Sequence, residues 1–220
     1  MAPERLNSPG EALTYTSQVM SDDAELLQRW RSGDKSAGDA LFNRHFESLR
    51  RFFRNKVGVT EVEDLLQRTL LACVESVERF RSDASFRTYL FAIARNQFAE
   101  HLRRKGRKSM REAVDLSITS VRDAGMSPSL VAAAHEQHAL IAEAMQSIPV
   151  DFQITLELFY WEQLKGPELA EVLGISPATV RTRLHRARTA LKKRLAELAP
   201  QLATDDTSLE RSVSGLAAVL

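Results

Sequence analysis

Hydrophobic residues recur at intervals of three and four over most of residues 22–105, which is the period of amphipathic helices. Alternation of apolar and polar positions, typical of strands, is hard to find there. A first helix is expected to begin near Asp22, where Glu25 supplies the acidic residue of a capping box, and to end at Gly33. The pattern therefore predicts an all-α protein.

Three longer helices are predicted next. The first ends at Gly58, the second runs from Glu61 to Phe80, and the third runs from about Ser85 to Arg104. Each carries one wide apolar stripe, so that four amphipathic helices can share one core. The stripes are Leu41, Phe42, His45, Phe46, Leu49, Phe52 and Phe53; Leu65, Leu66, Thr69, Leu70, Cys73, Val77 and Phe80; and Phe86, Leu90, Ile93, Ala94 and Phe98.

The helical period stops between Gly106 and about Val131, where several serines, Gly125 and Pro128 predict a flexible linker. Helix returns at about Ala132 and is interrupted at Pro149. We therefore expect an all-α fold of two helical domains joined by a flexible linker. The expected boundaries are a flexible N-terminus at 1–20, a first domain at 21–108, the linker at 109–134, a second domain at 135–199 and a tail at 200–220.

The tail after Pro200 is polar, but four of its apolar residues stand at helical spacing, namely Leu209, Val213, Leu216 and Leu220. Two interpretations stay open. The tail can form an amphipathic helix that docks on one domain and regulates it, or it can be disordered.

Composition narrows the possible partners and compartments. The formal net charge of the 220 residues is +1, so any attraction to nucleic acid must come from the distribution of charge. Cys73 is the single cysteine, which excludes an internal disulfide, and its apolar neighbours predict a buried, inert thiol. Residues 1–20 lack the features of a signal peptide, and no segment reaches the roughly 18 apolar residues of a membrane span. We expect a cytoplasmic protein without membrane insertion.

The stretch ISPATVRTRLHRAR, residues 175–188, follows a tight corner. Gly166 and Pro167 mark the start of a short helix, and Gly174 suits the left-handed position that ends one. Ser176 is a good N-cap for the next helix, and Pro177 fits its first position. Two helices joined by so short a turn form a helix-turn-helix, whose second helix can lie in the DNA major groove.

The second helix of this motif is basic outside its apolar face, with no acidic residue between Glu171 and Glu197. Mixed charges would gain about 0.2–0.5 kcal/mol for each i,i+4 pair, so a polyanionic partner explains the pattern. A basic surface helix without a specific target is the alternative. The residues expected to contact duplex DNA are Ser176, Ala178, Thr179, Arg181, Thr182, Arg183, His185, Arg186 and Arg188, with bases read in the first turns and phosphates held by Arg183, Arg186, Arg188 and Lys192.

A second informative segment, residues 80–108, combines aromatic residues with a basic end. Tyr89 is expected to face outward, where a ring beside arginine can stack on an unpaired base. Phe86 and Phe91 either share that surface or belong to the core. The side chains expected to hold phosphates here are Arg95, Arg103, Arg104, Lys105, Arg107 and Lys108.

Two stretches in this order resemble a known family. They are DLLQRTLLACVESVERFRSDASFRTYLFAIARNQFAEHLRRK, which begins at Asp64, and GPELAEVLGISPATVRTRLHRARTALKKRL, which begins at Gly166. Over about residues 20–108 and 135–198 the chain resembles a bacterial RNA polymerase sigma factor. It is most similar to the extracytoplasmic-function (ECF) branch of the sigma-70 family, which has only regions 2 and 4.

The resemblance implies a division of labour between the two domains. Region 2 would dock on the β′ clamp of core RNA polymerase through Asp64, Leu65, Leu66 and Gln67. Region 4 would read the promoter −35 element with the helix-turn-helix. Region 2 would also open the −10 element and capture its non-template strand with Arg81, Ser82, Asp83, Ser85, Phe86, Arg87, Tyr89, Arg95, Asn96, Arg103 and Arg104. The implied partners are core RNA polymerase, including its β flap, promoter DNA and an anti-sigma factor, with no cofactor.

The sequence departs from the family pattern in two places. Arg68, Leu70 and Val74 replace an acidic residue and two aromatic residues beside the polymerase contact, which puts that contact in question. Lys165 replaces the usual serine before the helix-turn-helix, where Gly166 and Pro167 can start the helix instead.

Catalytic motifs are absent from the sequence. HEQH, residues 135–138, has one residue too few between its histidines to place both on one helix face, so no metal site is expected. Neither a nucleophile elbow nor a phosphate-binding glycine-rich loop occurs, and we expect no enzyme activity. The alternatives to a sigma factor are a stand-alone helix-turn-helix regulator and a helical metallohydrolase around His135 and His138.

Overall fold

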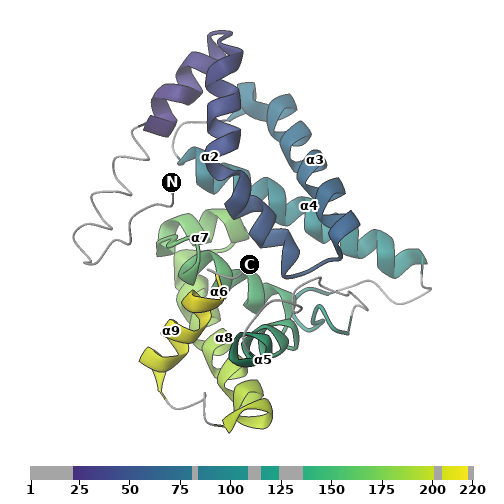
Figure 1. Cartoon of the computed structure of the whole chain (residues 1–220). Coiled ribbons are helices and arrows are strands. Elements are labelled where there is room, and N and C mark those ends of the chain that lie inside the picture. Colours follow the sequence, from purple (N-terminus) through teal and green to yellow (C-terminus); the bar gives the residue numbers. More distant parts are fainter. Residues whose placement is uncertain (1–21, 81–83, 109–114, 124–135, 201–204, 218–220) are drawn as a thin grey trace.

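The helices of the first half lie where the apolar spacing predicts them. The computed structural model describes residues 22–80, 84–108, 115–123, 136–200 and 205–217 (Figure 1). The first helix spans residues 22–31, and Gly33 after it has a φ of 99°, which glycine adopts without strain. α2 (Lys35–Arg54) begins directly afterwards, because the side chain of Asp34 accepts a hydrogen bond from the backbone N–H of Ala37.

α2 ends at Arg54 and not at Gly58, so the predicted end of this helix was wrong. Asn55 and Lys56 leave the helix with fully buried side chains. Gly58 is instead the N-cap of α3 (Val59–Ser76), where its N–H donates a hydrogen bond to the Glu61 side chain. The physical reason is that two polar residues turn inward to partners on a distant helix, which a local pattern does not contain.

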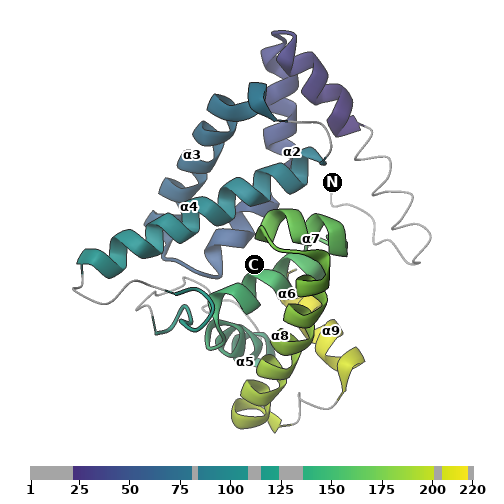
Figure 2. The same ribbon diagram turned by 180° about the vertical axis from the view of Figure 1, so that it is seen from behind.

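α4 (Phe86–Lys108) crosses α2 and α3, behind them in the view of Figure 1 and in front of them in that of Figure 2, and closes the N-terminal module, residues 22–108. A short 3-10 turn, Val77–Arg79, connects α3 to the segment that leads into α4. The predicted apolar face of α4 is confirmed for Phe86, Leu90, Ala94 and Phe98, which are all buried. Cys73 is buried as predicted, and burial raises the pKa of its thiol to about 12.

The C-terminal module, residues 136–217, is also built of helices. Pro149 precedes α6 as its N-cap. Apolar residues from several of these helices form its own core, among them Ile141, Met145 and Leu191. The helices of this module up to residue 198 are α5 (Glu136–Gln146), α6 (Val150–Tyr160), α7 (Gly166–Leu173) and α8 (Pro177–Leu198).

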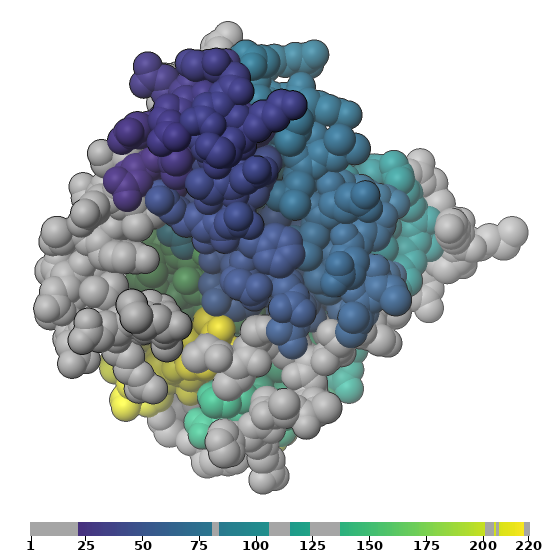
Figure 3. All heavy atoms as spheres, turned by 45° about the horizontal axis from the view of Figure 1, so that its top comes forward, coloured from purple at the N-terminus to yellow at the C-terminus, as the bar shows by residue number. Residues whose placement is uncertain are grey.

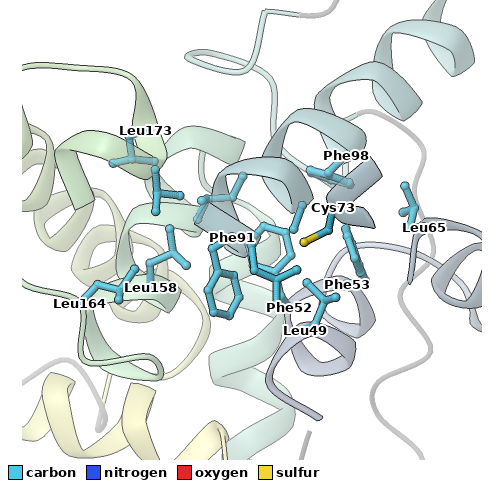
Figure 4. Packing of buried hydrophobic residues seen from close by; sticks show 14 of the residues in the cluster. Leu49, Phe52, Phe53, Leu65, Cys73, Phe91, Phe98, Leu158, Leu164 and Leu173 are labelled. Atoms are coloured by element: carbon cyan, nitrogen blue, oxygen red, sulfur yellow. The ribbon is translucent and has the colours of Figure 1, made fainter. Parts of the chain in front are cut away.

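The two modules are in direct contact, because one apolar cluster continues from the first into the second. α7 lies along α4 in both ribbon views (Figures 1 and 2). Phe91 of α4, fully buried, points toward Leu158 and Leu164 of the C-terminal module (Figure 4). The predicted all-α fold is thus confirmed, with the added finding that the two helical bodies share a buried surface.

Part of the predicted linker is ordered. Residues 115–123 form turns that pack against the start of α6, where Val150 N–H donates to Thr119 and Asp151 N–H donates to Leu116. Val121 in this segment is fully buried. The flanking residues 109–114 and 124–135 lie outside the described part of the chain.

The C-terminal tail forms a docked helix, α9 (Asp206–Leu216). Leu209, Val213 and Leu216 are buried against the C-terminal module, and Trp161 Nε1–H donates a hydrogen bond of 2.8 Å to the Val213 carbonyl. Atoms of α9 surface beside the end of α2 (Figure 3), where Arg51 lies 3.5 Å from the Ala217 carbonyl. Of the two interpretations of the tail, docking is therefore the observed one; Leu220 lies outside the described residues.

None of the described helices is both long enough and apolar enough to cross a membrane.

Candidate nucleic-acid interface

The corner between α7 and α8 has the geometry that its sequence predicts. Gly174 ends α7 in the left-handed conformation, with a φ of 65°. The Ser176 hydroxyl then accepts a hydrogen bond of 3.2 Å from the Thr179 N–H, and Pro177 is the first residue of α8. At the start of α7 the Glu168 carboxylate accepts the N–H of Lys165, which replaces the expected serine cap. α7 and α8 thus form a helix-turn-helix.

α8 packs against the module with one face and presents the other to solvent. The buried face is the predicted one, with Val180, Ala187, Leu191 and Leu195. At 100° per residue, the opposite face is centred on Thr182 and Thr189. Seven of the nine residues predicted to contact duplex DNA are exposed: Ser176, Ala178, Thr179, Arg181, Thr182, His185 and Arg186.

Arg183 and Arg188, the other two, are half-buried and already have partners. Arg183 lies 3.1 Å from a carboxylate oxygen of Asp151 on α6. Arg188 donates to the Tyr160 hydroxyl at 2.9 Å and lies over the Phe159 ring. Both side chains therefore hold α8 against α6 in this structure, which corrects the expectation of freely exposed phosphate ligands.

A recess of about 300 Å³ opens between α6 and the first turns of α8. Hydroxyl and guanidinium groups line it, from Thr179, Thr182, Arg183 and Arg186, together with the Asp151 carboxylate. Hydroxyls and guanidiniums are the groups that contact phosphates and base edges. This surface can therefore bind a polyanion through its exposed Arg186, whereas the charge of Arg183 is already neutralised by Asp151.

The start of α4 differs more from the expectation. Phe86 is buried against Trp30, Phe42 and His45, so it belongs to the core. Tyr89 was expected to face outward, but it is half-buried: its ring centroid lies 4.4 Å from that of Phe80. Its hydroxyl lies 2.5 Å from that of Ser76.

The basic residues of α4 divide into two groups. Arg103 and Arg104 are exposed near the end of the helix and pair with Glu100. Arg87 and Arg95 are instead held by carboxylates of the C-terminal module. Of the remaining predicted residues, Asn96 is exposed, Ser85 caps α4 through the Thr88 N–H, and Arg81, Ser82 and Asp83 lie outside the described residues.

The predicted polymerase contact on α3 is half core and half surface. Leu65 and Leu66 are buried, which removes them from any docking surface in this conformation. Gln67 is exposed, and Asp64 pairs with Arg68 at 2.9 Å, so the family departure at position 68 neutralises the acidic residue beside it. Two exposed residues of this face that the prediction did not include are Leu71 and Val74, which are 56% and 48% exposed.

Carboxylates of the C-terminal module form a polar contact with the N-terminal module. Glu162 is buried and lies 2.8 Å from Arg51 and 2.5 Å from Arg87. Asp151 lies 3.4 Å from Arg95 and also holds Arg183. Burial alone would raise the pKa of Glu162, but Arg87 and Arg51 outweigh it and keep that pKa below its ordinary value. The sequence gives no signal for these pairs, because their members lie far apart along the chain.

A third buried carboxylate, Glu157, meets the Lys56 ammonium at the end of α2. Asn55 and Gln153 donate hydrogen bonds of 2.8 and 2.9 Å to its other oxygen. Burial lowers the pKa of Lys56, although the nearby Glu157 charge acts in the opposite direction. We call the residues Arg51, Lys56, Arg87 and Arg95 with Asp151, Glu157 and Glu162 the inter-module ion pairs.

Among the described residues, no group of three His, Cys, Asp or Glu side chains is placed to hold a metal ion. His135 of the HEQH stretch lies outside those residues, so the absence of a metal site stays a prediction.

Comparison with known proteins yields one consistent group. The ECF sigma factor family matches residues 20–197. The ECF RNA polymerase sigma-E factor of Haemophilus influenzae is 25% identical over 182 residues, covering 80% of this chain and 96% of that protein. The sigma-E factor of Escherichia coli K12 is also 25% identical, with 80% and 95% covered.

Two solved structures share the fold. CnrH in complex with the cytosolic domain of CnrY has a TM-score of 0.59 and 24% identity, covering 80% of this chain and 98% of that one. The sigma factor RpoE in complex with the anti-sigma factor NepR from Bartonella quintana has a TM-score of 0.57 and 20% identity, covering 71% and 95%. The family match ends at residue 197, before α9 begins.

Proposed function

The chain belongs to the ECF sigma factor family, and we propose that its exposed α8 face reads the −35 element while α4 and α3 serve the −10 strand and core RNA polymerase. The family match spans both modules, so it supports an initiation factor over a stand-alone regulator that would use the helix-turn-helix alone. We take residues 21–108 as region 2 and residues 135–199 as region 4.

The outer face of α8 is the observation that carries this proposal. Thr182 and Arg186 project from it within the first three turns, and Glu197 is the one acidic residue of the helix. A helix of about this width enters the major groove, where arginine can bond to guanine edges and threonine to bases or phosphates. The recess beside Thr179 would accept the adjoining phosphates.

Capture of the −10 strand would rest on fewer side chains than the family resemblance implies. Asn96, Arg103 and Arg104 are exposed along α4 and can reach a backbone directly. Tyr89 is half-buried, and its ring centroid lies 6.4 Å from that of the buried Phe86.

The polymerase contact would be more apolar than in the family pattern. Gln67, Leu71 and Val74 lie on the solvent side of α3 and follow one another at helical spacing. Arg68 pairs with Asp64, so the charge usually offered to the polymerase is reduced. We propose that burial of Leu71 and Val74 replaces the missing aromatic contacts.

The remaining properties follow from membership of the family. The protein would act in the cytoplasm with core RNA polymerase, and the polymerase would supply the catalytic residues. By analogy with the complex of RpoE and the anti-sigma factor NepR, an anti-sigma factor would hold it inactive.

Run-off transcription tests the proposal. The purified chain with core RNA polymerase is expected to give promoter-specific transcripts from fragments of its own genome. Thr182→Ala combined with Arg186→Ala should abolish those transcripts, whereas Arg50→Ala on the exposed side of α2 should not. Absence of a specific transcript from every genomic fragment would overturn the proposal.

A further inference from the structure

Three of the arginines expected to contact promoter DNA are paired with carboxylates of the C-terminal module. Arg87 and Arg95 of α4 pair with Glu162 and Asp151 across the contact between the modules. Arg183 of α8 pairs with the same Asp151. Asp151 thus lies between an arginine of each proposed DNA surface.

A carboxylate and a DNA phosphate offer a guanidinium the same kind of acceptor. Both carry a negative charge on two or more oxygens in the geometry that arginine prefers. Glu162 is buried between Arg51 and Arg87, and these two arginines neutralise its negative charge inside the protein. The Arg87 and Arg95 side chains are 25% and 19% exposed, so a phosphate can replace their carboxylate partners only after the two modules separate at these pairs.

The span of a promoter requires such a separation. By the positions in their names, the −35 and −10 elements are about 25 base pairs apart, which is roughly 85 Å of DNA at about 3.4 Å for each pair. A 220-residue chain folded into one body has a radius of gyration of about 17 Å, so its two modules in contact span roughly half that length. The arrangement with α7 against α4 therefore cannot hold both elements at once.

We propose that Asp151 and Glu162 keep the protein in a closed, inactive arrangement by competing with promoter phosphates for Arg87 and Arg95. This inference rests on the proposed function for the identity of the DNA surfaces. When the modules separate, DNA phosphates replace the internal carboxylates as partners of these arginines. The free chain therefore binds DNA weakly. The promoter complex is favoured once both modules bind DNA.

The polar character of the contact suits this role. A contact made only of apolar side chains would resist separation whatever the ligand, whereas ion pairs can be replaced by pairs of the same kind. The apolar part, around Phe91, supplies the free energy that holds the modules together in the absence of DNA.

The test compares the full-length chain with the double variant Asp151→Asn, Glu162→Gln. The matched control is Asp39→Asn, Glu47→Gln, which removes the same charge from two exposed positions of α2. For each protein, small-angle X-ray scattering gives the radius of gyration, and fluorescence anisotropy gives the Kd for a labelled duplex of random sequence. Random sequence suffices because phosphate contacts are independent of base sequence.

The double variant is expected to have a larger radius of gyration and to bind the duplex roughly tenfold more tightly than the control, a coupling of ordinary size between two states. The inference is overturned if the double variant stays as compact as the wild type, or if it binds no tighter than the control. If the double variant does not fold, the single variant Asp151→Asn, which changes the less buried carboxylate, is tested instead. Its radius of gyration and its Kd for the duplex are judged in the same way.

Run-off transcription separates this inference from the proposed function. If the wild-type chain initiates transcription with core polymerase, but the double variant has the same radius of gyration and duplex Kd as the control, only the proposed closed state is overturned. A wild-type chain that never initiates overturns the proposed function, while scattering still reports whether the carboxylates hold the modules together.

Discussion

Lys56 and Glu157 form an ion pair in which both side chains are enclosed, with 0% and 1% of their surface exposed. The two residues are 101 positions apart and belong to different modules. A buried charge is tolerated when its partner and further hydrogen bonds are present, and here Asn55 and Gln153 complete the site. The pair therefore makes the closed arrangement depend on both modules at once.

Removal of one partner should be costly. Lys56→Met leaves the Glu157 carboxylate buried without its cation, and we expect the free energy of unfolding to fall by about 3–5 kcal/mol. Lys56→Met with Glu157→Gln keeps an acceptor for Asn55 and Gln153 without the charge, and should recover most of the loss. Denaturation in guanidinium measures both variants. Equal losses in the single and double variants would contradict this account.

Ser176 should affect stability through the cap and DNA binding through the position of α8. Ser176→Ala removes the acceptor for the Thr179 N–H and is expected to cost about 1 kcal/mol of stability. Ser176→Asn keeps a capping oxygen and should melt close to the wild type. Thermal melting distinguishes the two, and a fully stable Ser176→Ala protein would show that the cap is dispensable.

Arg186 should contribute a phosphate contact. Arg186→Ala is expected to weaken binding to any duplex and to reduce the slope of log K against log salt by about 1. Arg50→Ala removes the same charge from α2 and should leave the slope unchanged. Titrations at several salt concentrations measure both, and an unchanged slope for Arg186→Ala would place that side chain away from the DNA backbone.

Glu162 should make stability depend on acidic pH. Its pKa in the folded protein lies below the ordinary 4.5, so its contribution is fully present above pH 4.5 and is lost as the pH falls through the lower folded value. We expect the difference in free energy of unfolding between the wild type and Glu162→Gln to be constant near neutrality and to narrow below pH 4.5. A difference that widens on acidification would refute the assignment.

Deletion of residues 201–220 should destabilise the C-terminal module. The buried residues of α9 are each at most 1% exposed: Leu209, Val213 and Leu216. Burial of one such side chain is worth about 1.5–3 kcal/mol, so the truncated chain should melt at a clearly lower temperature. Val213→Asp tests the same contact with the tail retained. An unchanged melting temperature for both proteins would mean that α9 is not docked in solution.

Local features of this fold could be predicted from the sequence because they depend on neighbours along the chain. The buried face of α8, the left-handed Gly174 and the Ser176 cap all follow from spacing and residue type. The end of α2 could not, since Asn55 and Lys56 leave the helix for partners that only the folded chain supplies.

The candidate site shows the same division. Exposure of Thr182 and Arg186 follows from the helical period, which places them opposite Val180 and Leu191. Arg183 is also off the apolar face, but it meets Asp151, which comes from another helix. Charge patterns along one helix thus identify a basic surface without showing which of its arginines are already paired.

The order of synthesis gives the buried ion pair a further significance. At roughly 5–20 residues per second, Glu157 leaves the ribosome roughly 5–20 s after Lys56, because 101 residues separate them. During that interval the N-terminal helices can assemble while Lys56 stays hydrated and Phe91 lacks its later neighbours. Closure then follows assembly of the N-terminal module, so that the first module of a nascent chain stays open for about 5–20 s.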